Sequence, residues 1–351
     1  LADDSDPARV AAELAERPAA EVEESVYAAG GLAVAVRTPR EWAAHPQGAA
    51  VAGRPLLSLE RIADGPVRRP AAGPPGLPAH GLRVLDLTRV IAGPVATRTL
   101  ALLGADVLRI DSPHLPESQD AHHDTGLGKR SAVLDLARRA DRAVFEELLS
   151  GADVVVSGYR PGALDRYGLE PLALAERRPG LVVAQLSAWG AYGPWGGRRG
   201  FDSLVQVACG IAAAEAGADG QPGVLPAQAL DHGTGYLTAA AVLRAVSEQH
   251  AGGGTHLARL ALAQTAAWLT GATGRDSEGD PRGASSGPAE HDEPYAQPYA
   301  PEPWLTEADG PLGRVRHAVS PVCFDGGPRG WTRLAGRWGT DAPAWSRPAA
   351  P

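Results

Sequence analysis

The chain has 351 residues, a formal net charge of −8 and 44% hydrophobic residues, values typical of a globular protein with one large and one smaller domain or two modest domains. The negative charge argues against a nucleic-acid partner, and the apolar runs are too short to span a membrane. Cys209 and Cys323 are too few for a disulfide framework or a zinc site. We interpret them as reduced, buried thiols, which fits a cytoplasmic protein.

The N-terminus carries no sign of a signal peptide, because Leu1–Glu16 is acidic and lacks an apolar stretch. The chain contains no methionine, so we do not expect Leu1 to be the natural start. Lys129 is the sole lysine, and arginine supplies almost all other positive charge.

Residues 1–64 read as a small α/β piece. An Ala/Glu-rich helical stretch reaches about Ala28 with a break at Pro18, and the apolar run 32–36 predicts a short buried strand. Pro39 begins a further helix. Residues 65–80 are rich in Pro and Gly and read as a linker.

The pattern from about residue 80 to 205 predicts a doubly wound α/β domain, because strands and helices alternate in units of about 30 residues, as in a parallel sheet. The fold class is therefore α/β. The expected strands are 82–87, 106–110, 153–156 and 181–186, and the expected helices are 93–103, 140–150 and 172–176.

The remainder of the chain is less regular. Residues 203–250 are Ala-rich and mostly helical, and 257–269 reads as a strand that turns into a helix. We expect 251–303 to be a connecting segment, partly disordered, because 271–303 is polar and rich in Gly and Pro. Residues 304–351 contain several tryptophans, so we expect them to pack back on the core.

Common catalytic motifs are missing from the sequence. It has no Gly-x-Gly-x-x-Gly after the first strand, no Walker A loop and no nucleophile elbow around Ser187. His122, His123 and Asp124 lack a further ligand at useful spacing, so we predict no metal site. Loops that follow the strands carry several arginines, which suit a phosphorylated ligand, although ordinary surface charge would explain them equally well.

A series of segments occurs in a recognisable order. They read GLRVLDLTRVIAGP at 81–94, LGADVLRI at 103–110, GKRSAVLDL at 128–136, ADVVVSGYRPG at 152–162, LSAWG at 186–190, GP at 193–194, GFD at 200–202 and DHGTG at 231–235. Over roughly residues 81–268 this order resembles the family III CoA-transferases. That family includes formyl-CoA and carnitine CoA-transferases and the 2-methylacyl-CoA racemases.

The resemblance implies an enzyme that moves CoA between an acyl-CoA and a carboxylic acid, with no tightly bound cofactor and with CoA as a substrate. It implies an α/β fold with a Rossmann-like parallel sheet in the large, CoA-binding domain at 81–250 and a smaller α/β domain. It also implies an interlocked homodimer and a catalytic aspartate at Asp231, which passes through an aspartyl anhydride and an aspartyl-CoA thioester. A carboxylate held in a dry site is a competent nucleophile toward a thioester. Asp231 also suits the N-cap of a following helix, and Gly233 and Gly235 would let the substrate approach.

The residues that match the family's CoA contacts come from several loops, with Arg166 as the expected phosphate partner and Lys129 and Arg130 as further charge nearby. They are Ile91, Ala92, Leu134, Asp135, Leu136, Ala137, Gly158, Tyr159, Arg160, Arg166, Arg199, Gly200, Phe201 and Asp202.

Three departures from the family pattern leave alternatives open. Phe201 stands where the racemases carry a proton-transferring histidine, which argues against racemisation unless His232 substitutes. The candidate for the family's covering glycine loop, 251–255, comes early in the chain. Residues 10–62 look like the end of a preceding family III half, so the active site forms either within one chain or across a dimer. An acyl-CoA racemase-like enzyme and a non-catalytic CoA-binding paralogue are the alternative functions.

Overall fold

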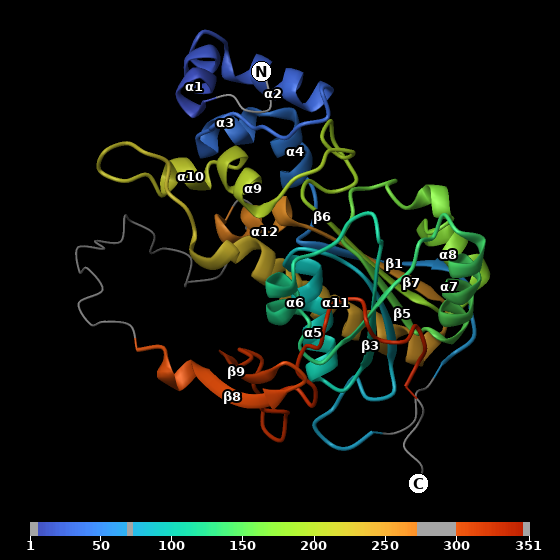
Figure 1. The fold of residues 1–351 in the computed structure, drawn as a ribbon. Coiled ribbons are helices and arrows are strands. Elements are labelled where there is room, and N and C mark those ends of the chain that lie inside the picture. The colour runs from blue at the N-terminus through green and yellow to red at the C-terminus, as the bar shows by residue number, and fades with distance from the viewer. Residues whose placement is uncertain (1–5, 69–72, 272–299, 347–351) are drawn as a thin grey trace, which may run out of the picture.

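The computed structural model describes residues 6–68, 73–271 and 300–346, and its centre is a seven-stranded sheet (Figure 1). In spatial order the strands are β1 Leu57–Ala63, β7 Thr255–Ala261, β6 Val182–Ser187, β5 Val154–Ser157, β2 Arg83–Leu87, β3 Asp106–Asp111 and β4 Arg130–Val133. All neighbouring pairs run parallel except β1, which is antiparallel to β7. The expected α/β class is confirmed, with β8 Leu305–Gly310 and β9 Gly313–Ala318 as a small second sheet.

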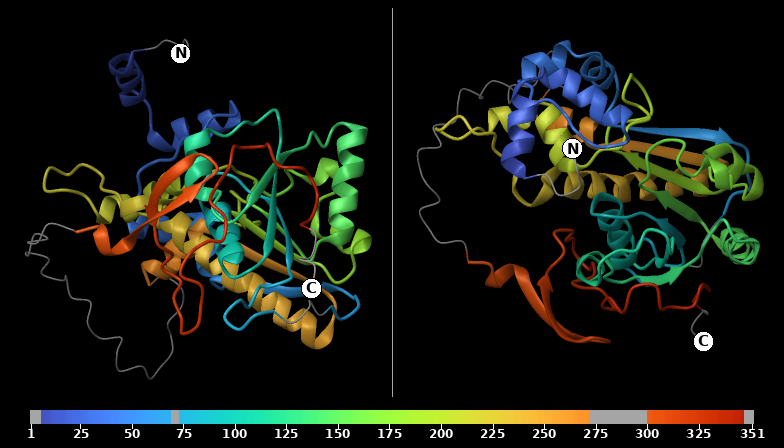
Figure 2. Two further views of the ribbon diagram at one scale, coloured as in Figure 1. Left: turned by 60° about the horizontal axis from the view of Figure 1, so that its bottom comes forward. Right: turned by 45° about the horizontal axis from the view of Figure 1, so that its top comes forward.

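Helices cover both faces of the sheet, so strands such as β2 and β5 are buried on both sides (Figure 2). Along β2, Val84 belongs to a hydrophobic cluster that includes α5 and α11, whereas Leu85 belongs to a second cluster that includes α7 and α8. This alternation is the two-residue period of a strand. The helices are α1 Pro7–Ala15, α2 Ala19–Ala28, α3 Pro39–Ala44, α4 Pro46–Ala52, α5 Ala92–Leu102, α6 Gln119–Thr125, α7 Arg139–Gly151, α8 Pro171–Arg177, α9 Asp202–Ala208, α10 Ile211–Ala214, α11 Ala229–Gly252 and α12 Leu262–Leu269.

The strand predicted at 32–36 is wrong. That segment pairs with no strand in the described part of the chain; instead the backbone N–H of Ala35 donates to the Glu23 carboxylate at 2.8 Å, and Arg37 forms a buried ion pair with the same group. The strand of this region is β1, whose pairing with β7 brings the N-terminal segment into the main sheet.

The N-terminal segment also holds the loop that follows β6. The buried Gln47 side chain donates from Nε2 to the carbonyl of Trp189 at 2.9 Å, and its Oε1 accepts from the backbone N–H of Trp195 at 2.8 Å. Trp42 packs against both indoles. The N-terminal segment therefore contacts the core at β7 and at this loop, while the division of the chain into domains remains a prediction.

Tryptophans of the C-terminal segment return to the core as expected. Trp338 Nε1 donates to Asp111 at 2.9 Å, Trp331 to the carbonyl of Arg98 at 2.7 Å and Trp345 to the carbonyl of Leu148 at 3.0 Å. Trp304 is the exception, with 59% of its surface exposed.

Three further expectations can be compared with the structure. Cys209 is buried as predicted but Cys323 is exposed, because it lies in the irregular stretch after β9; both are free thiols. None of the helices in the described ranges is long and apolar enough to cross a membrane. The disorder expected within 251–303 concerns residues 272–299, which lie outside the described residues.

Candidate active site

The predicted functional loops meet at one edge of the sheet, because parallel strands all end on the same side. Helix α11 begins at this edge, since it runs back across the sheet before the chain enters β7. This places Asp231, in the first turn of α11, among the loops that follow the strands.

The Asp231 side chain is buried without a partner. Only 7% of the residue is exposed, and its carboxylate makes no hydrogen bond or ion pair with any described residue. Burial raises the pKa of Asp231 to about 7, and the nearby Asp202 carboxylate adds to the increase. About half of the Asp231 side chains are therefore protonated near neutral pH.

Asp202 fixes the backbone of Asp231. Its Oδ2 accepts a 2.8 Å hydrogen bond from the Asp231 N–H, and its Oδ1 accepts from the Gln206 side chain. Gln206 in turn accepts from the backbone N–H of Leu225 at 2.8 Å. Asp202 is 1% exposed, and both of its carboxylate oxygens are used in these contacts, one of which caps the first turn of α11. Its predicted CoA contact remains a prediction.

The chain enters α11 in a strained conformation. Ala227 (φ 53°) and Gln228 (φ 53°) both lie in the left-handed region, which side chains with a Cβ avoid. Two such residues in succession turn the chain sharply just before Asp231. Strain of this kind persists only where surrounding contacts impose it, and it is common at functional sites.

Gly235 has a different role from the one expected. A Cβ there would lie 2.6 Å from the carbonyl oxygen of Ala92 and 2.7 Å from Val95, so glycine is needed for α11 to pack against α5. Gly233 has no such restriction, since its Cβ would make an ordinary 3.4 Å contact with Thr265. Because Asp231 lies one helical turn from Gly235, this packing brings the catalytic candidate close to Ala92, a predicted CoA contact.

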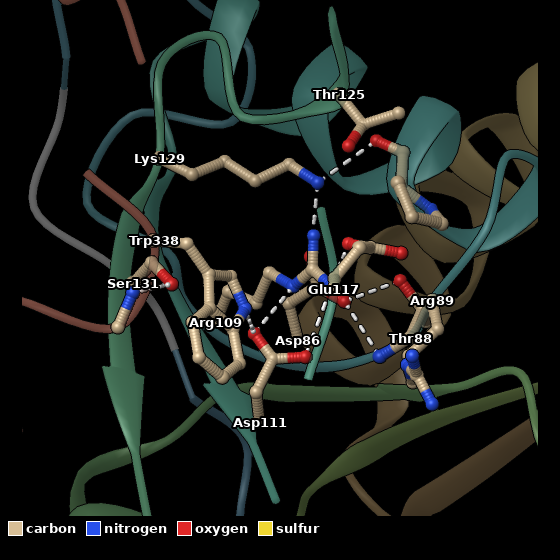
Figure 3. Close-up of polar contacts among 12 residues, drawn as sticks. Asp86, Thr88, Arg89, Arg109, Asp111, Glu117, Thr125, Lys129, Ser131 and Trp338 are labelled. Atoms are coloured by element: carbon tan, nitrogen blue, oxygen red, sulfur yellow. Dashed lines mark hydrogen bonds and ion pairs between the residues drawn. The ribbon is translucent and has the colours of Figure 1, made fainter. Parts of the chain in front are cut away.

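A buried polar network supports the loop between β2 and α5 (Figure 3). Asp86 accepts from Thr88 and Thr97 and pairs with Lys129 Nζ at 3.0 Å, and Lys129 also donates to the carbonyl of Pro94 at 2.9 Å. Burial raises the pKa of Asp86, but Lys129 and Arg109 outweigh it, so the pKa lies below its usual value. Burial lowers the pKa of Lys129 to about 8 against the pull of Asp86.

A second branch of this network reaches the same loop from the side. Arg109 is fully buried between Asp111 and Glu117, and Glu117 Oε1 accepts from the backbone N–H of Val90 at 3.2 Å. Val90 has φ 68°, a strained value for a β-branched residue. The network thus fixes the loop that carries Ile91 and Ala92.

The predicted CoA residues lie on both sides of the loop after β5. Leu134, Leu136 and Tyr159 line a cavity of about 50 Å³ between that loop and the ends of β3 and β4. Tyr159 and Arg160 line a larger cavity toward β6 and β7, and Arg160 and Arg199 share an open depression with α2. Gly158 lies beside Thr88 and Leu186.

Other predicted residues are placed by contacts with the chain itself. Asp135 accepts from Ala137 N–H at 3.0 Å and contacts His114 at 3.1 Å, which makes it a turn-forming residue. Arg166 lies exposed over the ring of Tyr167, and Gly200 packs on the Trp189 indole. Phe201 is 47% exposed at the start of α9. None of this tests the predicted CoA contacts, which remain predictions.

The histidines give little support to racemase-like chemistry or to a metal site. His232 follows Asp231 on the same helix and so points about 100° away from it; burial lowers its pKa, followed by the effect of Arg98. His122 is buried, and burial lowers its pKa to about 4. Over the described ranges, no group of three or more His, Cys, Asp or Glu residues could hold a metal ion.

The glycine-rich segment 251–255 does not cover Asp231 of its own chain. It joins the end of α11 to β7, where Gly254 N–H donates to the carbonyl of Gly65 at 2.9 Å. Asp231 is at the other end of α11, about 30 Å away at 1.5 Å per residue. The expectation of a covering loop is therefore corrected.

Sequence reasoning missed the structural role of two residues that organise this edge. Lys129 was expected to add charge near CoA, but it is fully buried against Asp86. The signal was an aspartate within a buried strand, which requires a cation or several donors. Gln47 was not singled out, because no local pattern marks a residue whose partners lie more than 140 positions away.

Comparison with known proteins decides the family. A sequence model described as CoA-transferase family III matches residues 80–301, more than half of the chain. The chain belongs to CoA-transferase family III. The family III relatives include acetyl-coenzyme A transferase nodX of Hypoxylon pulicicidum, 36% identical over 188 residues, and succinate–glutarate CoA-transferase of Agrobacterium fabrum, 31% identical over 181 residues.

The same relationship is visible in three dimensions. The crystal structure of Rv3272 from Mycobacterium tuberculosis matches with a TM-score of 0.53 at 32% identity, over 56% of this chain and 58% of that chain. The sequence match to nodX covers 52% of this chain but only 32% of nodX. The match to the Agrobacterium protein covers 46% of this chain and 45% of that protein. Because this family III chain spans half or less of those relatives, the match establishes membership and leaves activity to experiment.

Proposed function

We propose that the chain transfers CoA from an acyl-CoA to a carboxylic acid, with Asp231 as the nucleophile. The observation that supports this most is the buried, unpaired Asp231 carboxylate at the carboxyl edge of the sheet, one helical turn from the contact with Ala92. A buried carboxylate without partners is costly to a protein, so its retention favours a chemical role.

The reaction begins with attack of ionised Asp231 on the carbonyl carbon of the bound thioester. The C–S bond breaks, CoA leaves as a thiolate, and an acyl-aspartyl anhydride remains. The thiolate then attacks the aspartyl carbonyl of the anhydride. The donor acid leaves as its carboxylate, and Asp231 is held as a thioester with CoA.

The acceptor acid completes the cycle by the reverse sequence. Its carboxylate attacks the aspartyl-CoA carbonyl and releases the CoA thiolate, which forms a second anhydride. The thiolate attacks the acceptor carbonyl, so acceptor-CoA leaves and the Asp231 carboxylate is regenerated. Each step exchanges one carboxylate for one thiolate, so no proton, metal or redox partner is needed.

The surroundings of Asp231 suit these steps. A carboxylate whose pKa is about 7 is more nucleophilic than an ordinary aspartate and still half ionised at neutral pH. The N-terminal turn of α11 places partial positive charge beside the developing oxyanions. Asp202 holds the Asp231 backbone, so the side chain reacts from a fixed position.

CoA is bound, in this proposal, by the loops that the resemblance assigns to it. The loop Gly158–Arg166 separates the two cavities beside β5 and carries Arg160 and Arg166, whose guanidinium groups suit phosphate oxygens. No hydrogen bond or ion pair joins the Arg160 guanidinium group to another described residue, so its charge is available to a ligand.

Intact-protein mass spectrometry tests the proposal. The protein is mixed with a panel of acyl-CoAs and treated with hydroxylamine, which converts an activated aspartyl group to a hydroxamate. We expect a mass change that maps to Asp231 with at least one donor. Asp231→Asn should show no change while it still binds CoA; an adduct on the variant, or on another residue, would remove Asp231 from the mechanism.

The same samples also distinguish between the two alternative functions, a racemase-like enzyme and a non-catalytic CoA-binding protein. If CoA binds but no donor gives an adduct, exchange of the α-hydrogen of an acyl-CoA in heavy water distinguishes the remaining functions. Exchange would favour racemase-like chemistry, with His232 as the next residue to replace. No exchange would favour a non-catalytic CoA-binding protein.

A further inference from the structure

The larger cavity beside β5 has a composition that the proposed mechanism does not use. Its volume is about 280 Å³, and it lies where the ends of β5, β6 and β7 meet the beginning of β1. Neither Asp231 nor Asp202 lines it. The N-terminal segment 54–60 supplies one wall, so the cavity exists only because that segment joins the sheet.

Several buried polar atoms at this cavity have no well-formed hydrogen bond with the described residues. They are Oε1 and Nε2 of Gln264, the hydroxyl of Tyr192 and Nε of Arg259. Gln264 is 3% exposed, so its amide lies inside the molecule. Buried polar groups normally find partners, and a group of unpaired ones around a cavity indicates a ligand that supplies them.

The unpaired atoms are mainly donors. Gln264 Nε2, the Tyr192 hydroxyl and Arg259 Nε can all donate, which matches the acceptor-only oxygens of a carboxylate. Gln264 Oε1 is the remaining acceptor. The Gln264 amide and the Tyr192 hydroxyl make a weak hydrogen bond with each other, which opposes the burial that raises the pKa of Tyr192 to about 12.

The charge around the cavity also favours an anion. Arg54, Arg160 and Arg259 line it against the two acidic residues Glu60 and Asp165. Arg54 lies over the Tyr192 ring at 4.8 Å, and the ion pair between Arg259 and Glu60 is long, at 3.6 Å. The guanidinium groups are therefore only weakly neutralised by the chain itself.

The rest of the lining is aliphatic. Leu56, Leu164, Leu169, Leu186 and Leu260 face the same space, which suits a hydrocarbon chain and excludes a highly charged ligand. The volume lies just below the usual range for ligand pockets, about 300–1,000 Å³, so the ligand is small.

We propose that this cavity binds a short aliphatic carboxylate, with its carboxylate held by Gln264, Tyr192 and Arg259 and its chain among the leucines. The binding proposal stands on the cavity alone and does not depend on chemistry at Asp231. Tyr159 and Arg160 belong both to this cavity and to the predicted CoA loop, so an acid bound here contacts that loop directly.

Titration calorimetry with sodium acetate, butyrate and hexanoate tests the site, with hexanamide as the uncharged control. We expect one hexanoate per chain and binding of hexanamide weaker by about tenfold or more, because hydrogen bonds to a charged group are the strong ones. Equal binding of acid and amide, or no binding of any acid at millimolar concentration, would overturn the proposal; in the second case ordered water occupies the cavity.

Two variants test the site through two measurements, the Tm and the affinity for hexanoate. Gln264→Leu and Tyr192→Phe each remove unpaired polar atoms, so we expect a higher Tm together with hexanoate binding reduced about tenfold. The matched control is Gln249→Leu. Gln249 is also 3% exposed, but its amide accepts from Arg68 N–H at 3.1 Å and donates to the carbonyl of Pro66 at 2.7 Å. This variant should lower Tm and leave hexanoate binding unchanged.

The outcomes for the site and for the proposed transfer reaction are independent. A Gln264→Leu protein with a lower Tm, or with unchanged hexanoate affinity, would show that the amide already has a partner and would overturn the site. Asp231→Asn should bind hexanoate like the parent chain. If it does, and the parent gives no aspartyl adduct, the transfer proposal fails while the acid site stands.

Discussion

Asp86 and Asp231 are both buried aspartates near the same edge of the sheet, yet their surroundings are opposite. Asp86 has a lysine at 3.0 Å and hydroxyl groups from Thr88 and Thr97, and its pKa lies below the ordinary value. The Asp231 carboxylate has no partner among the described residues, and its pKa rises to about 7. The same kind of side chain is thus neutralised by its neighbours in one place and left without a partner in the other.

The two aspartates lie close to one another in the fold, because the loop anchored by Asp86 leads to the helix that packs beside Asp231. The loop that begins at Thr88 is anchored by Asp86 and ends in α5, whose Ala92 packs at Gly235 one turn from Asp231. The paired Asp86 carboxylate holds the loop, and the unpaired Asp231 carboxylate is the one for which we propose a catalytic role. Four predictions test this division, in order of decreasing effect.

Lys129→Met should cause the largest loss of stability. It leaves the Asp86 charge buried without its cation, and breaking a buried pair in this way costs about 3–5 kcal/mol. Unfolding in urea, followed by circular dichroism, measures the change in the free energy of unfolding.

The matched control for that measurement is Arg244→Met. Arg244 pairs with Glu248 on the surface of α11, where the two side chains are 70% and 40% exposed, so the expected loss is below about 1 kcal/mol. Equal losses for the two variants would mean that Lys129 does not neutralise Asp86 in solution.

Asp231→Asn should raise stability at alkaline pH. The folded-state pKa of Asp231 (about 7) lies above the ordinary 3.8, so the folded chain holds more protons and stability falls as pH rises from about 4 to 7. The variant removes this loss, which is about 2–4 kcal/mol for a shift of this size.

Thermal unfolding of both proteins at pH 5 and pH 8 measures the effect. The difference between them should already be measurable at pH 5, which lies above the ordinary pKa of 3.8, and should be larger at pH 8. Transfer activity of the parent chain should rise over the same interval, since only ionised Asp231 attacks the thioester. A constant difference in Tm across this range would show that Asp231 titrates normally.

Gly235→Ala should destabilise the chain by about 1–3 kcal/mol, because the new methyl overlaps the carbonyl of Ala92 and overpacking is costly. CoA affinity should fall with it, since α5 carries the predicted CoA loop. Gly252→Ala is the control: it lies at the end of the same helix with nothing within 4 Å of the added methyl, so it should be neutral or stabilising by up to about 1 kcal/mol.

Val90→Gly should have the smallest effect, a gain of about 1 kcal/mol from relief of the left-handed backbone. Val90 is 43% exposed, so little packing is lost. Val224→Gly is the counterpart: Val224 is 75% exposed and its φ is not positive, so the change should cost about 0.5–1 kcal/mol. Changes of the same sign in both variants would indicate that Val90 is not strained.

Much of the sheet was predictable because each parallel strand is a short apolar run with turn residues at its ends. The strands β2, β3, β5 and β6 lie within a residue or two of their predicted positions, and β7 passes into α12 as expected. The missed strands are β1, β4 and the hairpin β8–β9. Arg130–Val133 is short and half polar, and Leu57–Ala63 becomes a strand only through its pairing with the distant β7.

The sequence suggests a nucleophile for the candidate site but not the contacts that support the site. The segment at 231–235 identified Asp231 through a family resemblance, whereas the pairing of Asp86 with Lys129 depends on residues 43 positions apart. The role of Gly235 likewise follows from the approach of α5, which no local pattern encodes. Sequence patterns report local periodicity, and these contacts are set by tertiary packing.

The antiparallel pairing of β1 with β7 has a consequence for synthesis on the ribosome. Leu57 is translated about 200 residues before its partner Leu260, which corresponds to a delay of roughly 10–40 s at usual elongation rates. During that time β1 is an unpaired strand on a nascent chain, and its alternation of Leu57 and Leu59 with polar residues makes it a target for chaperones or for pairing with a neighbouring nascent chain. The wall of the 280 Å³ cavity is therefore completed late in folding, after β7 has left the exit tunnel.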